Sequence, residues 1–333
     1  MLRQRFGKSM WPTILLATCC LALLFACQQQ APNAPTGPAA DNAEPQGTIR
    51  VSGAWALYPM MVRWGEEYSK LYPKVRVDIS AGGAGKGAAD ALAKMVNLGM
   101  VSRTIKPQET AQGGVYVPVA KDAVFPTVNS NNPAVAAGLL TRGIPRSVFV
   151  ALFINGETRT WNQILGTEGG EPVQVYSRSD SCGAAETWAT YLGGEGQEAL
   201  QGVSVYGDPG LAEAVRRDIQ GLGFNNLNFA YDTKTGLPMP GIVPVPIDIN
   251  ENGTVDPEEK LGTKKMAIAA VAAGHYPSPP ARNLNLLTKE KFTGVTKHFV
   301  RWILTDGQQY LAEVGYIPVA PDQLKQALQM IEQ

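Results

Sequence analysis

The stretch VQVYSRSDSCGAAETW contains residue types suited to holding an anion at the start of a helix. The planar guanidinium of Arg178 meets two oxygens of an oxyanion at once, and Asp180 is near enough along the chain to orient it. A turn that leads into a helix adds backbone N–H donors and a favourable dipole, and Gly183 and Ala184 are placed for this role. The alternative is an exposed Arg–Asp ion pair in a loop, which contributes little to the stability of the fold.

A second glycine turn lies in the sequence AGGAGKGAADALAKMV. Gly83, Gly85 and Gly87 are expected to form the turn, and the alanine-rich part that follows is expected to form a helix. This turn offers a second set of backbone donors for an anion. Lys86 suggests a nucleotide-binding loop, but the spacing differs from the Walker pattern and no Ser or Thr follows the lysine. Nucleotide binding is therefore discounted.

Cys182 is the third candidate for chemistry, and three interpretations stay open. At a helix N-terminus beside Arg178, a lowered thiol pKa would favour a thiolate that binds a soft ligand, such as trivalent arsenic or a thiophilic metal. Alternatively, the thiol is a small buried apolar replacement for serine. A catalytic nucleophile is the weakest interpretation, because neither His275 nor His298 is near it in sequence.

A separate motif, IDINENGTVDPEE, matches the oxygen spacing of a calcium loop over residues 248–259. The side chains that alternate around such a loop would supply the oxygen ligands, Gly253 would permit the sharp turn, and Glu259 would close the coordination sphere. The expected metal ligands are Asp248, Asn250, Asn252, Thr254, Asp256 and Glu259. The alternative is a solvated turn rich in Asn and Asp. We expect a lone structural Ca²⁺ here and no cofactor for function.

The N-terminus predicts export and a lipid anchor. Three basic residues precede an apolar run that is too short to span a bilayer comfortably, and the run ends in LFAC. This ending resembles a bacterial lipobox, so residues 1–26 are predicted to be a lipoprotein signal peptide and Cys27 the acylated residue. Residues 27–47, rich in Pro, Ala, Asn and Gln, are predicted to be a flexible linker. The alternative is an uncleaved helix that ends by chance at a cysteine.

Removal of the signal changes the charge and the cysteine count. It leaves 26 basic and 29 acidic residues, a net charge of −3, so no basic field favours nucleic acid. Of the four cysteines, Cys19 and Cys20 leave with the signal and Cys27 takes the lipid. Cys182 is then alone in an oxidising compartment, where an unpaired thiol is unusual.

The elements that must position these residues alternate between strand and helix. TIRVSGA and VRVDIS have strand patterns, and NLGMVSR continues them. Between the first two, Pro59 opens a segment with apolar residues at helical spacing. The order strand, helix, strand, glycine loop, helix, strand predicts an α/β layered domain.

The succession GAWALYPMMVRWGEEYSKLYPKVRVDISAGGAGKGAADAL, LGMVSRTIKP, VNSNNP, LFINGETRTWNQI, VYSRSDSCGAAETW, GLGFNNLNFAYD and YPSPPARNLNLLT resembles the phosphate-binding (PstS-like) periplasmic solute-binding proteins of ABC transporters. The resemblance covers nearly the whole mature chain. It implies an α/β fold of the type II periplasmic-binding-protein class, with a ligand cleft between two lobes joined by crossing strands. The first lobe would hold residues 48–121 and 282–333, and the second lobe residues 122–281.

The matched positions imply a ligand set drawn from both lobes: Leu57, Tyr58, Ala84, Gly85, Arg103, Arg178, Asp180, Cys182, Gly183 and Ala184. Arg103 has an alternative role as a residue of the lobe surface. The sequence departs from the family where relatives place Ser and Thr, because Ala54, Trp55, Ala56, Ala84, Cys182 and Ala184 lack a hydroxyl. Each lost hydroxyl removes a donor to an ionised ligand, worth roughly 1.5–3 kcal/mol. We therefore expect weaker phosphate binding than the family pattern implies.

Taken together, the sequence predicts a monomeric, lipid-anchored, extracytoplasmic protein that catalyses nothing. It would capture phosphate or a related inorganic oxyanion and deliver it to ABC permease subunits in a bacterial membrane. One alternative is a sensor or scavenger lipoprotein that binds a different, soft ligand through Cys182. Another is a hydrolytic or redox enzyme that uses this thiol.

Overall fold

The computed structural model describes residues 44–333, which form one compact unit. The predicted signal peptide (residues 1–26), the lipidation site at Cys27 and most of the predicted linker (27–47) lie outside the described residues. Among residues 44–333, every helix falls short of the length and apolar character needed to span a bilayer.

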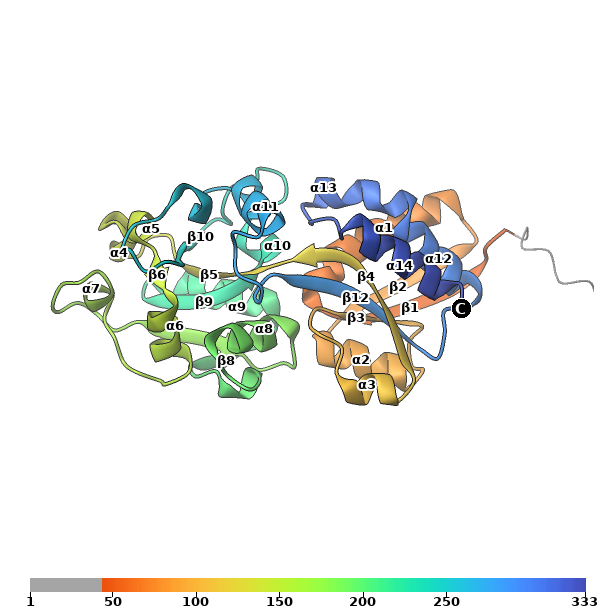
Figure 1. Ribbon diagram of the computed structural model, residues 1–333, viewed down its shortest axis with the longest axis horizontal. Helices are drawn as coiled ribbons and strands as arrows, with labels where there is room; N and C mark the ends of the chain where they lie inside the picture. The colour runs from red at the N-terminus through yellow and green to blue at the C-terminus, as the bar shows by residue number, and fades with distance from the viewer. Residues whose placement is uncertain (1–43) are drawn as a thin grey trace, which may run out of the picture. The chain divides into compact units, whose positions relative to one another are not determined.

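The first lobe is built on a five-stranded mixed sheet with the order β2-β1-β3-β12-β4. Strand β1 runs parallel to β2 and β3, whereas β12 is antiparallel to both β3 and β4. The strands are β1 Gly47–Gly53, β2 Val75–Ala81, β3 Leu98–Val101, β4 Gly114–Asp122 and β12 Arg282–Lys289. This sheet combines the N-terminal and C-terminal parts of the described chain (Figure 1).

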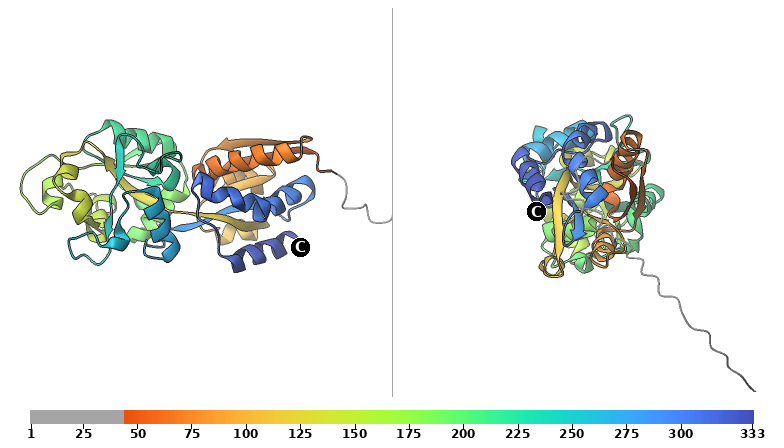
Figure 2. Two further views of the ribbon diagram at one scale, coloured as in Figure 1. Left: turned by 90° about the horizontal axis from the view of Figure 1, so that it is seen from above. Right: turned by 90° about the vertical axis from the view of Figure 1, so that its right-hand side faces the viewer.

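Helices cover both faces of this sheet, as Figure 2 shows. Gly65 of α1 lies against Val77 and Ile79 of β2, whereas the Ser52 hydroxyl of β1 donates a hydrogen bond to Asp90 of α2 on the opposite face. The alternation of side chains along a strand explains the two faces. The helical elements of this lobe are η1 Trp55–Leu57, α1 Tyr58–Leu71, α2 Ala84–Leu92, α3 Pro107–Ala111, α12 Gly294–Leu304, η4 Asp306–Tyr310, α13 Leu311–Val314 and α14 Pro321–Ile331.

The second lobe has its own five-stranded sheet, ordered β10-β5-β9-β7-β8. Here β7 is parallel to β8 and β9, and β5 is antiparallel to β9 and β10. Its strands are β5 Val124–Asn129, β7 Gln174–Arg178, β8 Val203–Val205, β9 Gly221–Asn226 and β10 Ile242–Pro244, with a separate parallel pair, β6 Ile144–Pro145 and β11 Ile247–Asp248. The helical elements are α4 Pro133–Ala136, α5 Leu139–Arg142, α6 Arg146–Phe153, α7 Trp161–Ile164, α8 Gly183–Leu192, η2 Gln197–Ala199, α9 Gly207–Arg217, α10 Leu227–Ala230, η3 Pro257–Glu259 and α11 Lys264–Ala273.

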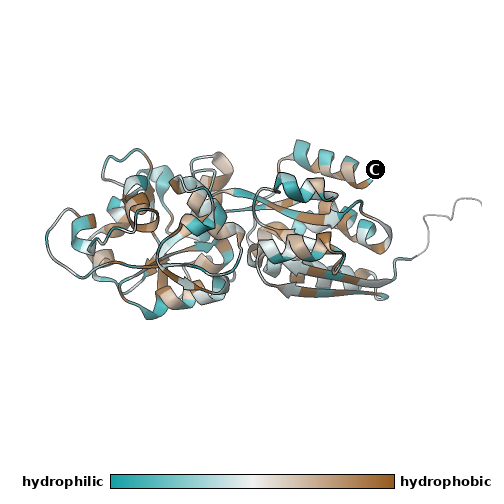
Figure 3. Cartoon of the chain, turned by 90° about the horizontal axis from the view of Figure 1, so that it is seen from below, coloured by the Kyte–Doolittle hydropathy of each residue, from teal (hydrophilic) through white to brown (hydrophobic). Residues whose placement is uncertain are grey.

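Each lobe has its own hydrophobic core, and hydrophobic residues concentrate in the strands of both sheets (Figure 3). In the first lobe, the Tyr68 ring lies 4.7 Å from that of Phe299 and 5.4 Å from that of Trp302. In the second lobe, Trp188 packs against Phe149 and Phe224. Buried aromatic rings of this size contribute strongly to a core. The predicted α/β class with two lobes is therefore observed.

Two extended segments connect the lobes. Strand β4 ends at Asp122 in the first sheet, and β5 begins at Val124 in the second. The return passes through the segment before Arg282, where β12 pairs with β4 in the register Arg282↔Asp122. Figure 1 shows these paired strands between the two sheets. The crossing therefore places one acidic and one basic residue opposite each other at the boundary of the lobes.

Candidate anion site between the lobes

The N-termini of α2 and α8 meet where the two lobes touch. Gly83 precedes α2 with a φ of +90°, and the N–H of Gly85 donates a hydrogen bond of 3.0 Å to the carbonyl oxygen of Ser181, just before α8. A Cβ at Gly183 would lie 2.1 Å from the carbonyl oxygen of Ser102 at the end of β3. Glycine is required for so close a backbone approach. The predicted turn is shorter than expected, because α2 begins at Ala84 and includes two of its three glycines.

Arg178, at the end of β7, forms a buried ion-pair cluster. Its Nε and Nη2 donate to the two carboxylate oxygens of Asp180 at 2.7 Å each, and Nη1 donates to Asp208 Oδ2 at 2.8 Å. The Arg178 side chain is fully buried, so the alternative of an exposed loop pair is wrong. Burial opposes the charge on Arg178, but the carboxylates of Asp208 and Asp180 raise its pKa overall. Asp180 also accepts the N–H of Gly207, which fixes it to the start of α9.

The cluster continues to the crossing strands. Asn226 Nδ2 donates to Asp208 Oδ1 at 2.6 Å, and its Oδ1 accepts from Arg282 Nη2. Arg282 Nε donates to the Ser102 carbonyl oxygen at 2.8 Å. The remaining nitrogen, Nη1, lies 3.7 Å from Asp122 Oδ2, and both buried atoms lack a hydrogen-bond partner within residues 44–333. Arg282 and Asp122 are therefore close in charge but are not joined by a hydrogen bond.

Burial also changes the charge balance at the crossing. It raises the pKa of Asp122 to about 6, although the guanidinium of Arg282 opposes the shift. Burial likewise lowers the pKa of Arg282, against the attraction of Asp122 and Asp208. Desolvation penalises the charged form of each group, and the 3.7 Å separation gives incomplete compensation.

Sequence reasoning missed Asp122, Asp208, Asn226 and Arg282. The available signal was a lone acidic residue inside the apolar run VPVAKDAVFPTV and a lone arginine before NLNLLT. A charged residue in an otherwise apolar strand is rare without a partner. Its partner, however, lies on a distant part of the chain and is not visible from local spacing.

Cys182 caps α8 in a way that overturns the predicted thiolate. Its Sγ accepts the N–H of Ala185 at 3.4 Å, and the side chain is buried. Burial raises the pKa of the thiol to about 12, and the nearby Arg178 only partly opposes this shift. The expectation that the helix dipole and the cation lower this pKa is wrong, because desolvation dominates. At neutral pH the group is a neutral thiol.

The turn before α1 carries the indole ring of Trp55. The Trp55 ring lies 6.4 Å from the ring of Tyr206 and against Gly207 of the second lobe, and none of the described residues bonds to its buried Nε1. Leu57 is fully buried in the core of the first lobe, and the Tyr58 ring lies 6.2 Å from that of Trp55. The methyl groups of Ala84 and Ala184 are also buried. Leu57 and Tyr58 therefore form the N-terminus of α1, whereas Trp55 contacts the second lobe.

Arg103 is occupied by other protein groups. Its guanidinium donates to both carboxylate oxygens of Glu109, at 3.0 and 2.7 Å, and its Nε lies 3.2 Å from Glu186 of α8. Glu186 also lies 3.5 Å from Lys106. Arg103 thus ties the end of β3 to the second lobe.

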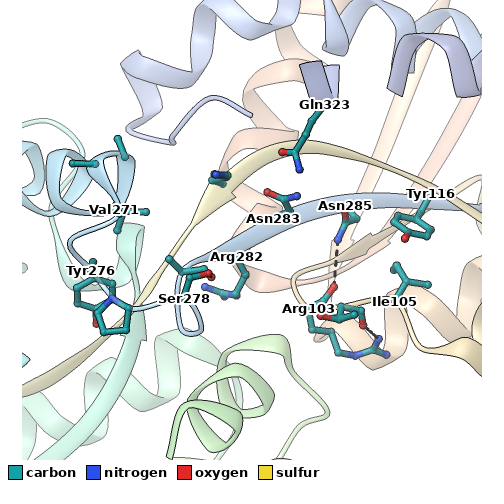
Figure 4. A pocket seen from close by; sticks show the side chains of 17 residues that line it. Arg103, Ile105, Tyr116, Val271, Tyr276, Ser278, Arg282, Asn283, Asn285 and Gln323 are labelled. Carbon is teal, nitrogen blue, oxygen red and sulfur yellow. Dashed lines mark hydrogen bonds between the residues drawn. The ribbon is translucent and has the colours of Figure 1, made fainter. Parts of the chain in front are cut away.

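A cavity of about 700 Å³ lies along the crossing strands (Figure 4). Its lining includes Arg282, Asn283, Asn285 and Gln323, and among the predicted ligand residues it includes only Arg103. The close-up shows Asn283 and Gln323 extending toward the same space from a strand and a helix. The cavity therefore shares Arg282 with the ion-pair cluster, but none of the described residues of α2 or α8 lines it.

The predicted calcium loop follows β11 and is closed by its own hydrogen bonds. The carboxylate oxygens of Asp248 accept the N–H groups of Asn252 and Gly253, at 3.1 and 2.9 Å. Both oxygens of Glu259 accept backbone N–H groups from the loop, and Gly253 has a φ of +79°. No group of three or more His, Cys, Asp or Glu side chains within residues 44–333 is arranged to hold a metal ion. The calcium prediction therefore still depends on the spacing of the carboxylate, amide and hydroxyl oxygens along the loop sequence.

Comparison with known proteins identifies the fold and its relatives. The family model for the PBP superfamily domain matches residues 38–306. The phosphate-binding protein PstS of Pseudomonas aeruginosa is 25% identical over 195 residues, which cover 55% of this chain and 59% of that protein. The chain thus spans less than two thirds of that relative. The PstS protein of Xylella fastidiosa is 23% identical over 351 residues, covering 94% of this chain and 95% of that protein.

Solved structures share the two-lobed architecture. A phosphate ABC transporter substrate-binding protein from Clostridium perfringens, solved with bound phosphate, aligns with a TM-score of 0.64 and 20% identity. The alignment covers 82% of this chain and all of that one. This similarity establishes the fold. The relatives named here are binding proteins, as the expectation of a non-enzymatic protein requires.

Proposed function

The chain belongs to the PBP superfamily, and on this premise we propose that it is an extracytoplasmic solute-binding protein for phosphate or a related inorganic oxyanion. It would close around the anion in the cleft between its lobes and deliver the anion to an ABC permease. The names of its relatives support this role, since those proteins are described as phosphate-binding. We further propose that it acts as a monomer and is anchored through Cys27.

The observation that carries the proposal is the buried guanidinium of Arg282 between the lobes, whose Nη1 has no hydrogen-bond partner in the part of the chain that the structure describes. Its Nε holds the Ser102 carbonyl oxygen, against which the first residue of α8 packs. The N-terminus of α8 and the charged Nη1 donor of Arg282 lie in the same region, and both kinds of group favour the binding of an anion. Arg178 donates its hydrogen bonds to the carboxylates of Asp180 and Asp208 in the same region. Its guanidinium is therefore not available to bind an anion through two parallel hydrogen bonds. The neutral Cys182 thiol gives no support to a soft, thiol-ligated ligand.

Native mass spectrometry of the purified protein tests the ligand. We expect an added mass that corresponds to one small oxyanion, released when the protein is denatured. Thermal unfolding with added phosphate, arsenate and sulfate supplies a second readout, since a ligand that binds only the folded state raises the unfolding temperature. A ligand-free mass together with unfolding unchanged by all three anions would contradict the proposal.

The lipid anchor has its own experiment. Replacing Cys27 by Ser removes the acylated sulfur, so the protein should move from the membrane fraction to the soluble fraction. Replacing Cys20, which lies inside the predicted signal, by Ser serves as the matched control and should leave the protein in the membrane fraction. Membrane retention of the Cys27→Ser protein would exclude this anchor.

We also propose that the 248–259 loop holds a structural Ca²⁺. The spacing of the oxygen-bearing side chains along the loop and the sharp turn at Gly253 support it. Chelation should lower the unfolding temperature, because the cation binds only the folded loop. The same treatment of a Glu259→Gln variant should have little further effect. An unchanged unfolding curve and no calcium by elemental analysis would refute the proposal.

A further inference from the structure

The cavity of about 700 Å³ along the crossing strands lies apart from the proposed oxyanion site. Arg282 borders the cavity, but its Nε and Nη2 donate to groups of the ion-pair cluster. The next residue of β12, Asn283, pairs with Lys121 of β4. Successive side chains of a strand point to opposite faces, and directly paired residues share a face. Asn283 and Lys121 therefore lie on the face of the crossing strands away from the Arg282–Asp122 pair.

Every charged side chain that lines this cavity is cationic. The three are Arg103, Lys121 and Arg282, and no carboxylate of the described residues joins them in the lining. Arg103 and Arg282 each have a carboxylate oxygen nearby, at 2.7 and 3.7 Å. By contrast, no ion pair within residues 44–333 includes Lys121. An ammonium without a counter-ion in a cationic cavity favours an anionic occupant.

Two side-chain amides add unsatisfied acceptors to the lining. Asn283 Oδ1 and Gln323 Oε1 are buried and lack a hydrogen-bond partner among the described residues. Both side chains extend toward the same space, one from β12 and one from α14 (Figure 4). Buried carbonyl oxygens normally accept a hydrogen bond, so these two require N–H or O–H donors from an occupant. The cationic lining disfavours an ammonium donor, and hydroxyl groups are therefore the donors that fit.

The second lobe gives the cavity an apolar end. It is formed by residues 271–273 at the end of α11 and by Tyr276 and Pro277 in the segment that follows. Figure 4 shows Val271 and Tyr276 at one end of the cavity and Asn285 at the other. A volume of about 700 Å³ is in the range of sites for small organic molecules. The cavity therefore suits a ligand with a carbon skeleton better than a bare inorganic ion.

From this lining we propose that the cavity is a second binding site, which takes a small organic anion with several hydroxyl groups, of the class of sugar acids and sugar phosphates. The acidic group of the ligand pairs with Lys121, and its hydroxyl groups donate to Asn283 and Gln323. Its carbon skeleton lies against the end of α11. The inference goes beyond the proposed function and does not depend on it, because the two sites lie on different faces of the crossing strands.

Calorimetric titration of the purified protein with gluconate and with glucose 6-phosphate tests the site. Binding of either probe supports it, and comparison of the two identifies the acidic group that Lys121 prefers. Glucose, which lacks the charge, and hexanoate, which lacks the hydroxyl groups, should each bind at least about tenfold more weakly. Gluconate should still bind when inorganic phosphate is present in excess.

Variants of the lining locate the bound probe. Lys121→Gln removes the ammonium group and should weaken the better-bound probe by about tenfold or more, with the affinity for inorganic phosphate unchanged. Gln323→Met removes the acceptor at similar size, so it should weaken the binding of gluconate but not of hexanoate. Lys325→Gln, an exposed substitution on α14, is the matched control and should behave as the wild type.

The outcomes separate this inference from the proposed function. The inference is overturned if the wild type binds neither gluconate nor glucose 6-phosphate, since the cavity then holds only water. Equal affinities for gluconate, glucose and hexanoate, equal affinities of Lys121→Gln and Lys325→Gln, or complete displacement of gluconate by phosphate also overturn it. The probe series on the wild type decides the matter even if a variant does not fold. Binding of a probe without any binding of phosphate, arsenate or sulfate defeats the proposed function and leaves this inference intact.

Discussion

At the scale of single residues, the two helix starts lack the hydroxyl donors that the family pattern implies, and we propose that charged groups serve in their place. Ala84, Cys182 and Ala184 stand at the two helix starts, and the buried Cys182 thiol accepts the Ala185 N–H in the first turn of α8. The buried guanidinium of Arg282 has one nitrogen, Nη1, without a hydrogen-bond partner among the described residues. The proposed site would thus depend on charge and backbone geometry.

Restoring the hydroxyls should strengthen anion binding. Cys182→Ser with Ala184→Thr adds two donors beside the start of α8, and we expect phosphate affinity to increase by about 1–3 kcal/mol. Serine is also a better helix cap, so stability should not fall through position 182. Calorimetry of this protein is compared with Cys182→Ala, which removes the thiol without adding a donor. Equal affinities in the two proteins would show that these positions do not reach the ligand.

Single residues were predictable where their partners are close along the chain. The Arg178–Asp180 pair was inferred from two residues two positions apart, and the structure forms it with both carboxylate oxygens. Asp208 was missed because it arrives from α9, thirty residues later. The thiolate prediction for Cys182 failed for a related reason, since local sequence indicates the dipole and the cation but not the depth of burial.

At the scale of elements, the N-termini of α2 and α8 control how closely the lobes approach. Gly183 is the first residue of α8 and lies against the Ser102 carbonyl oxygen, so no side chain fits there. The sequence predicted both helices from glycine turns and alanine-rich runs. It did not predict that the Gly85 N–H would bond to the opposite lobe, because that contact depends on how two separate sheets are placed.

Gly183→Ala should therefore hold the lobes apart. The added Cβ would lie 2.1 Å from the backbone oxygen of Ser102, which cannot move independently of β3. We expect a larger radius of gyration by small-angle X-ray scattering and loss of anion binding, with little change in helix content. Gly210→Ala, in α9 with no atom near the new Cβ, is the control. A Gly183→Ala protein with the wild-type radius and affinity would count against this contact.

At the scale of the whole molecule, the lobes are joined by the crossing strands and held together at separate points. Besides the contact of α2 with Ser181, Arg103 of the first lobe reaches Glu186 of the second, and Lys264 of the second donates to the Val314 carbonyl oxygen of the first at 2.9 Å. The alternation of strands and helices predicted two α/β lobes only with the help of the family resemblance. The ion pairs between them follow from the packing of the lobes.

The most direct test of the account is a calorimetric titration with phosphate at pH 6 of three proteins: the wild type, Arg178→Lys and Arg217→Lys. Lysine retains the charge but cannot hold Asp180 and Asp208 with a planar fork. Arg217, exposed on α9, pairs with Glu213 at the surface, so its replacement should cost little. The account predicts one phosphate per chain for the wild type and Arg217→Lys, and at least about tenfold weaker binding for Arg178→Lys, roughly 1.4 kcal/mol. No heat with the wild type, or equal affinity in all three proteins, would contradict an anion site between the lobes.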